Sequence, residues 1–183
     1  MAVRLRIPLP LLPCAATRIG MKLQFERFTV FCRDLEASLG FYRDALGLMV
    51  VEEKTLEGAM AGGLLQLPAC RMRIALLAAD ADAPVIVGLF EISQTPLAAL
   101  SPPLGKPAHG QSALVLSTDR FDALHAALSA GGHRFLTPPL AYPKRVASTR
   151  SPAGLYREMI VYDPDHVPVS ILQIDPLPEE TMA

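Results

Sequence analysis

A single carboxylate interrupts an apolar stretch in the first half of the chain. Glu91 lies in the segment VIVGLFEIS (residues 85–93), whose other residues are all uncharged and mostly apolar. A charge buried without a partner is energetically costly, so a carboxylate at such a position indicates a purpose. In an open cleft, this carboxylate can accept a proton or a hydrogen bond from a substrate. Glu91 is therefore the first candidate catalytic residue.

A second group of candidate residues lies in the segment PPLAYPKRVASTRSPAGLYRE (residues 138–158). We interpret this segment as a long loop and expect a mobile lid, because long loops inside compact domains are often functional. A basic lid favours an anionic ligand, such as a carboxylate, phosphate or thioester conjugate. The alternative is a solvated loop that balances acids elsewhere. Its basic residues outnumber its one acid, Glu158, and are Lys144, Arg145, Arg150 and Arg157.

An internal repeat supplies the elements that position these residues. The segments FTVFCRDLEASLGFYRDALGL and SALVLSTDRFDALHAALSAGG share one layout, in which Val30 corresponds to Val115 and Asp34 to Asp119. Each copy predicts a short strand, an Asp at the helix N-cap, about three helical turns and a Gly that ends the helix.

Three β-like segments follow each predicted helix. In the first half they are LMVVEEK, RMRIALLAA and VIVGLFEIS, and in the second half HRFLTPP, YREMIVYD and VPVSILQ. The pattern is β-α-β-β-β, twice. We expect an α+β fold in which two tandem βαβββ modules form a curved mixed sheet around a central cleft, with the helices outside. The expected modules span residues 22–95 and 111–176, joined by a Pro- and Gly-rich linker at 96–110.

The segments CRDLEASLGFYRDALGL (residues 32–48) and DPDHVPVSILQ (residues 163–173) resemble the vicinal oxygen chelate superfamily. This is the group of glyoxalases, bleomycin resistance proteins and extradiol dioxygenases. The resemblance covers roughly residues 25–175 and implies a small-molecule ligand, a homodimer and, in many members, a divalent metal. The metal ligands in such members come from the first and last strands of each module.

Carried over to this chain, the four ligand positions of the family are Arg27, Glu91, Ala113 and Ser170. A catalytic divalent ion needs about three protein ligands, and Arg27 brings a positive charge to the cation's place. We therefore expect no cofactor. If a metal (Fe, Zn, Ni or Mn) does bind, Glu91 and His109 are its ligands.

Strand alternation places Arg27, Thr29 and Phe31 on the predicted cleft face, with Phe28, Val30 and Cys32 under the helix. It also places Glu91 in the cleft and Phe90 and Ile92 against the helices. Arg27 and Glu91 then form an ion pair, either as mutual structural partners or as catalytic residues. In the catalytic interpretation Glu91 is the base and Arg27 anchors a carboxylate or enolate. The expected substrate-binding residues are Thr29, Phe31, Ala113, Arg145, Tyr156, Arg157 and Ser170.

Three functions follow from these expectations. The first is a glyoxalase-like isomerase or lyase that transfers a proton on an anionic or oxygenated metabolite without the usual metal. The second is a metal-free protein that sequesters a ligand, as in the bleomycin-resistance branch. The third is a metal-dependent lactoylglutathione-lyase-like enzyme or extradiol dioxygenase. The uncharged Ser170 has no base nearby in sequence and no nucleophile motif around it, so we do not interpret it as a nucleophile.

Composition excludes several other classes. The 183 residues include 17 basic and 18 acidic side chains, a net charge of −1, which indicates no general attraction to nucleic acid. The cysteines, Cys14, Cys32 and Cys70, show no CxxC spacing, which suits a reducing cytoplasm. No apolar run reaches the ~18 residues of a membrane span. We expect residues 1–21 to be a disordered extension before a natural start at Met21, and residues 177–183 to be a tail.

Overall fold

Two modules with the same order of strands, each with a helix after its first strand, make up the described part of the chain. The computed structural model describes residues 22–99 and 105–177, so the expectations for the extension before residue 22 and for the last six residues lie outside the described residues. The first module contains β1 (Phe28–Cys32), α1 (Leu35–Leu39), the π-helical turn η1 (Gly40–Ala45), β2 (Met49–Gly58), α2 (Ala59–Gly63), β3 (Cys70–Ala78) and β4 (Val85–Ser93). The second contains β5 (Leu114–Ser117), α3 (Phe121–Ala130), β6 (Phe135–Lys144), β7 (Gly154–Tyr162) and β8 (Pro168–Asp175).

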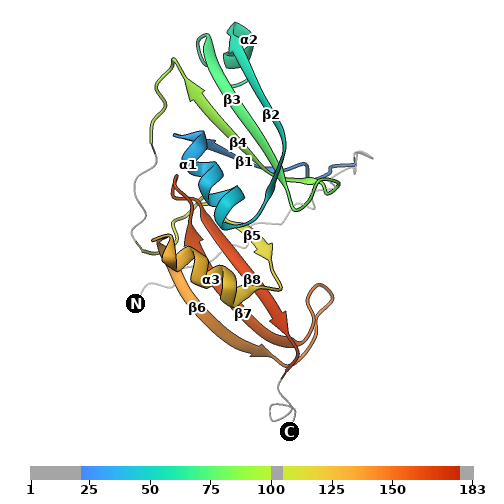
Figure 1. Cartoon of the computed structure of the whole chain (residues 1–183). Coiled ribbons are helices and arrows are strands. Elements are labelled where there is room, and N and C mark those ends of the chain that lie inside the picture. The colour runs from blue at the N-terminus through green and yellow to red at the C-terminus, as the bar shows by residue number, and fades with distance from the viewer. Residues whose placement is uncertain (1–21, 100–104, 178–183) are drawn as a thin grey trace, which may run out of the picture.

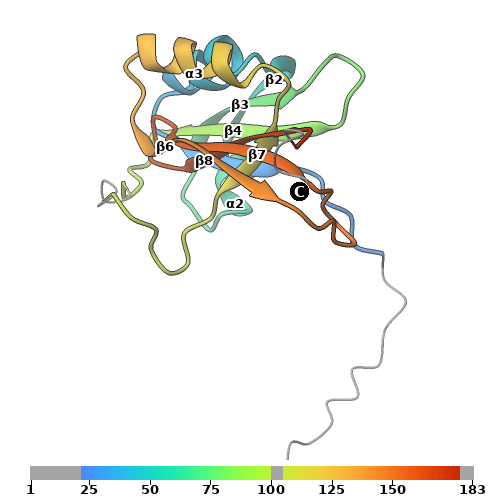
Figure 2. The ribbon, with the colours of Figure 1, turned by 90° about the horizontal axis from the view of Figure 1, so that it is seen from below.

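The strands form two four-stranded mixed sheets with matching orders, β1-β4-β3-β2 and β5-β8-β7-β6. In each sheet the first strand pairs in parallel with the last, and the other pairs are antiparallel. Figure 1 shows the two modules side by side, and in Figure 2 the helices α1 and α3 lie together on the same side of both sheets. The predicted α+β fold of tandem βαβββ modules is confirmed. The sheet consists of two separate halves, with β1 and β5 each at an edge.

One apolar core joins the modules on the helix side of the sheets. Val30, Leu89 and Leu39 of the first module share it with Leu128 and Ile171 of the second. Burial of such side chains stabilises each by roughly 1.5–3 kcal/mol relative to exposure, which holds the helices against both sheets. A smaller cluster covers the opposite face of the first sheet and includes Met72, Ile74, Phe90 and Ile92. The first sheet is thus apolar on both faces.

The helices α1 and α3 begin differently. Asp34 caps α1 as predicted, because its side chain accepts a hydrogen bond from the backbone N–H of Ala37 at 3.1 Å. The predicted cap at Asp119 is wrong. The N-cap of α3 is Arg120, which has no capping side chain, and Arg120 donates its own N–H to Oγ1 of Thr118 at 3.0 Å. A threonine therefore organises the turn that leads into α3.

The turn between β7 and β8 links the second module to the first. Asp163 accepts hydrogen bonds from the backbone N–H groups of Asp165 and Val167, which confirms the predicted turn. Its other carboxylate oxygen accepts a bond from the buried Tyr42 hydroxyl of η1 at 2.9 Å. Among the described residues, no helix is long and apolar enough to cross a membrane.

Candidate ligand pocket

Glu91 lies on the helix side of its sheet, and the predicted face of this residue is wrong. Its Oε1 accepts a hydrogen bond from the backbone N–H of Leu35 at 3.3 Å, and its Oε2 is 3.3 Å from Nη1 of Arg73. Leu89 belongs to the core under the helices, whereas Phe90 and Ile92 belong to the cluster on the opposite face. Both oxygens of Glu91 are therefore engaged, one by the first residue of α1 and the other by Arg73 of β3.

The second module repeats this arrangement. Oε1 of Gln173 in β8 accepts a hydrogen bond from the backbone N–H of Phe121, the first residue of α3, at 3.0 Å. Arg157 of β7 forms ion pairs with Asp122 of α3 and with Asp175 of β8. In the first module Arg73 likewise bridges Glu36 of α1 and Glu91 of β4. The arrangement satisfies a free amide at each helix start and ties that helix to its sheet.

Arg27 does not form the predicted ion pair with Glu91. Its guanidinium lies over the ring of Phe90, with 5.6 Å between Cζ and the ring centroid. Arg27 precedes β1 and is exposed, while Glu91 is on the other side of the sheet. The stacked cation gains a modest cation–π attraction at this exposed site. The predicted catalytic pair is thus separated by the sheet itself.

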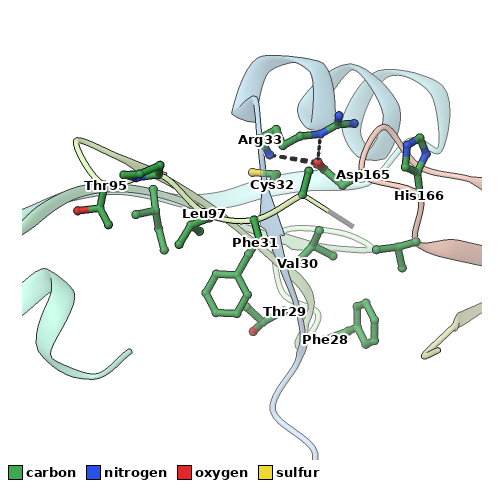
Figure 3. A pocket seen from close by; sticks show the side chains of 15 residues that line it. Phe28, Thr29, Val30, Phe31, Cys32, Arg33, Thr95, Leu97, Asp165 and His166 are labelled. Atoms are coloured by element: carbon green, nitrogen blue, oxygen red, sulfur yellow. Dashed lines mark hydrogen bonds and ion pairs between the residues drawn. The ribbon is translucent and has the colours of Figure 1, made fainter. Parts of the chain in front are cut away.

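A pocket of about 650 Å³ runs along β1. Six consecutive residues, 28–33, line it, although their side chains point alternately to the two faces of the sheet. Among the described strands β1 pairs with β4 alone, and the pocket follows the other edge of β1. Figure 3 shows Phe31 and Thr29, two predicted substrate-binding residues, on one wall and Leu97 nearby. The volume lies within the range of about 300–1,000 Å³ found for small-molecule sites.

The polar end of the pocket comes from the second module. Nε of Arg33 donates to Oδ1 of Asp165 at 2.8 Å, and the backbone N–H of Arg33 also bonds this carboxylate, as the dashed lines in Figure 3 show. His166 lines the same end with a left-handed backbone, φ +70°. This conformation is uncommon outside Gly and fixes the tight turn between β7 and β8. The sequence gives the turn a clear signal but does not show that it closes a pocket in the other module.

The pocket contains no activated nucleophile among the described residues that line it. Cys32 is the one thiol in its wall, and burial raises the pKa of this thiol to about 11. The thiol is therefore protonated and unreactive at neutral pH. Thr29 and Thr95 supply hydroxyl groups for hydrogen bonding. The lining is otherwise mostly apolar.

The donor set does not fit the four-ligand metal site of the family. On the face of the sheets opposite α1 and α3, Thr29 and Phe90 stand in β1 and β4, and Val115 and Ser170 in β5 and β8. These are hydroxyl and apolar side chains, whereas divalent metals of this kind take His, Cys, Asp or Glu ligands. The alternative ligand His109 lies in an exposed turn before β5. Within residues 22–99 and 105–177, no group of three or more such ligands is close enough to hold an ion.

The predicted lid is a β-hairpin. Strands β6 and β7 pair from Phe135 to Lys144, so the segment 138–158 consists of two paired strands joined by a tip at residues 145–153. Lys144 is held by Ser148 and Ser151, with 2.9 Å between Nζ and Oγ of Ser148. Arg157, predicted to bind substrate, is on the helix side with its ion-pair partners. Only part of the expected basic charge, including the exposed Arg145, thus faces solvent at the hairpin tip.

The remaining predicted residues divide between the hairpin and the open face. Tyr156 is buried, and its ring stacks on that of Tyr142 with centroids 5.5 Å apart. Ser170 donates its hydroxyl to Oε1 of Glu158 at 2.6 Å. Ala113 is exposed just before β5. Glu158 belongs both to the predicted lid and to the predicted strand segment YREMIVYD. The structure places it in β7, where alternation puts it on one face with Tyr156 and Ile160.

This fold defines a class of protein. Two tandem βαβββ modules, with α1 and α3 on one side of both sheets, are characteristic of the glyoxalase fold. The sequence of residues 24–171 matches the family described as the Glyoxalase/Bleomycin resistance protein/Dioxygenase superfamily, and the chain belongs to this superfamily. No curated protein is significantly similar to the chain in sequence.

Solved structures share the fold at low sequence identity. A glyoxalase family protein from Bacillus cereus is 16% identical over 87% of this chain and 99% of its own, with a TM-score of 0.68. The trypanothione-dependent glyoxalase I of Leishmania major is 13% identical over 88% and 90%, with a TM-score of 0.52. A glyoxalase/dioxygenase from Nostoc punctiforme is 16% identical over 94% and 100%, with a TM-score of 0.51. At such identities the likeness concerns the fold alone.

Proposed function

We propose that the protein binds and sequesters a small, largely apolar molecule in the pocket along β1, without using the usual metal of the family. The observation that carries this proposal is the pocket itself, about 650 Å³ with walls from Phe28, Phe31 and Leu97. Aromatic and aliphatic walls give affinity through the area that they remove from water. The polar end at Arg33 and His166 suits a ligand with one anionic or oxygen-bearing group.

Sequestration is favoured over proton-transfer catalysis by the position of Glu91. The enzyme hypothesis requires this carboxylate in the cleft, within hydrogen-bond reach of the substrate. Glu91 instead bonds the N–H of Leu35 and the guanidinium of Arg73, and it does not line the pocket. Asp165, the acid that does line the pocket, accepts hydrogen bonds from Arg33. A bound molecule is therefore expected to leave the pocket chemically unchanged.

Binding of the fluorescent dye 8-anilino-1-naphthalenesulfonate tests the proposal. The dye combines an apolar aromatic body with one sulfonate, which matches the walls and the polar end of the pocket. Leu97→Trp fills part of the pocket from an exposed segment, where the larger side chain places little strain on the core. We expect the wild-type chain to bind the dye with 1:1 stoichiometry, and Leu97→Trp to bind it at least about tenfold more weakly.

Leu64→Trp is the matched control, because Leu64 is 90% exposed after α2 and does not line the pocket. It should bind the dye as the wild type does. Equal dye affinity in Leu97→Trp and Leu64→Trp, with both chains folded by circular dichroism, would contradict the proposed site. Conversion of a bound metabolite to a new product, detected by mass spectrometry, would contradict sequestration and leave the site itself intact.

A further inference from the structure

Glu158 is the carboxylate of the open face in the second module. It stands in the middle of β7, where Leu140 of β6 and Leu172 of β8 are its ladder partners. Its neighbours in the strand, Arg157 and Met159, lie on the helix side, Arg157 over the ring of Phe121 and Met159 in the core. Because side chains alternate along a strand, Glu158 points to the face that carries no helix.

Neutral groups alone hold this carboxylate among the residues that the structure describes. Ser170 donates its hydroxyl to Oε1 at 2.6 Å, and Tyr142 donates its phenol to Oε2 at 3.2 Å. Among the described residues, no Lys, Arg or His nitrogen lies within 4.0 Å of the Glu158 carboxylate. The exposed carboxylates of Glu36 and Asp122, in contrast, have Arg partners. A half-buried carboxylate with neutral donors only is electrostatically uncompensated, which favours the approach of a cation.

Apolar surface surrounds the carboxylate on the same face. Leu140 is 55% exposed, and Val115, the ladder partner of Ser170, is 60% exposed. The stacked rings of Tyr142 and Tyr156 lie on the other side, two ladder positions along β6 and β7 and therefore on the same face. Such a surface offers apolar contact to the body of a ligand whose charged end reaches Glu158.

We propose that Glu158, Ser170 and Tyr142 form a second binding site, which takes a protonated amine carried on an apolar or aromatic body. The amine donates to the Glu158 carboxylate, and the body packs on Leu140 and Val115. None of these residues lines the pocket along β1, so this site is separate from the proposed sequestration pocket. The site is not visible in the sequence, because its groups come from different strands. Ser170 of β8 supplies a hydroxyl, and Glu158 of the neighbouring strand β7 supplies the acid.

The experiment is an NMR titration of the ¹⁵N-labelled full chain with benzylamine and, separately, with benzyl alcohol. The two probes share a ring and a methylene group and differ in the charged amine. We expect benzylamine to shift the amide signals of Tyr142, Glu158 and Ser170 in a saturable way. A charge-assisted hydrogen bond changes affinity by about 10- to 100-fold, so benzyl alcohol should bind at least tenfold more weakly.

Glu158→Gln removes the charge and keeps the shape, and it should weaken benzylamine binding at least tenfold. Glu53→Gln removes an exposed carboxylate from β2 and should leave the titration unchanged. Equal affinity for the two probes, unchanged binding in Glu158→Gln, or shifts confined to other regions would each overturn the proposal. The comparison of the two probes needs only the wild-type chain. It therefore tests whether binding depends on the charged amine even if Glu158→Gln does not fold.

Discussion

Glu91 and Gln173 occupy equivalent positions in the two modules, and each accepts a hydrogen bond from the first residue of the helix in its module. The bonds run from the backbone N–H of Leu35 to Oε1 of Glu91 at 3.3 Å and from that of Phe121 to Oε1 of Gln173 at 3.0 Å. An amide performs in one module the task that a carboxylate performs in the other. The shared task is structural, since only an acceptor oxygen is needed there.

This equivalence predicts that Glu91→Gln is mild and Glu91→Ala is not. Gln keeps the acceptor for Leu35 and loses a partly exposed ion pair with Arg73, which costs at most about 1 kcal/mol. Ala also leaves the Leu35 N–H without its acceptor, which adds about 1–2 kcal/mol. Urea unfolding of both variants measures the difference. Equal losses in the two variants would show that the carboxylate charge, rather than the acceptor oxygen, matters.

We expect the Asp163 carboxyl to make a contribution to the free energy of unfolding that decreases as the pH rises. Burial raises the pKa of its carboxyl to about 6, although the N–H of Val167 that bonds it acts in the opposite direction. In the unfolded chain the pKa is about 3.9, so the folded state binds the proton more tightly. The contribution is fully present below about pH 4 and is lost as the pH rises through 6, by up to about 3 kcal/mol.

Asp163→Asn isolates this effect, because Asn keeps an acceptor for Val167 and cannot titrate. The free energy of unfolding of the wild type, relative to that of the variant, should fall between pH 4 and pH 7. Carboxylates common to both chains cancel in this difference. A difference that is constant with pH, or one that rises, would contradict the assignment.

The contact between Asp165 and Arg33 joins the two modules at the pocket, so we expect its loss to lower both stability and dye affinity. Its side chain is 9% exposed and accepts bonds from the backbone and the guanidinium of Arg33. Asp165→Ala should cost about 1–2 kcal/mol of stability and weaken dye binding, because the turn that closes the pocket loses its anchor. The control is Asp44→Ala, which breaks the exposed pair with Arg43 and should change neither quantity. Unaltered dye affinity in Asp165→Ala would separate the turn from the pocket.

Addition of a divalent metal should leave the thermal stability of the protein unchanged. The face opposite α1 and α3 presents hydroxyl and apolar groups in β1, β4, β5 and β8, the strands that correspond to the ligand-bearing strands of the family, and a hydroxyl is a weak ligand for Zn²⁺ or Ni²⁺. Thermal unfolding with one equivalent of Zn²⁺, Ni²⁺, Mn²⁺ or Fe²⁺, before and after EDTA treatment, should give the same Tm. One tightly bound ion per chain that raises the Tm would show that ligands assemble in another way.

The repeat made the fold predictable, because Val30 and Val115 mark a strand in each half, and Asp34 and Asp119 each lie shortly before a helix, although only Asp34 caps its helix. The face of Glu91 was not predictable in the same way. The segment 85–93 is apolar on both faces of its sheet, with Leu89 under the helices and Phe90 in the opposite cluster. Periodicity cannot distinguish two faces that are both apolar, and the partners Leu35 and Arg73 become visible only in three dimensions.

In the second module, by contrast, the face on which Glu158 lies could be predicted from the sequence. The segment YREMIVYD is predicted as strand, and its alternation puts Tyr156, Glu158 and Ile160 on one face, although residues 138–158 are also interpreted as a long loop. The part of that segment in β6 contains Pro138, Pro139 and Pro143. Prolines fit here because β6 is an edge strand, where an N–H can be absent without loss of a ladder bond. The pocket along β1 depends on Asp165 and His166, which are far from β1 in sequence. Contacts across modules of this kind are set by packing and have no local signal.

Titration of 8-anilino-1-naphthalenesulfonate into Glu91→Gln tests the central claim most directly, with Leu97→Trp and the wild type measured alongside. The claim is that the ligand binds along β1 and that Glu91 serves the helix on the other side of the sheet. The predicted result is an unchanged dissociation constant for Glu91→Gln and a value at least about tenfold higher for Leu97→Trp. Lost binding in Glu91→Gln together with unchanged binding in Leu97→Trp would contradict it.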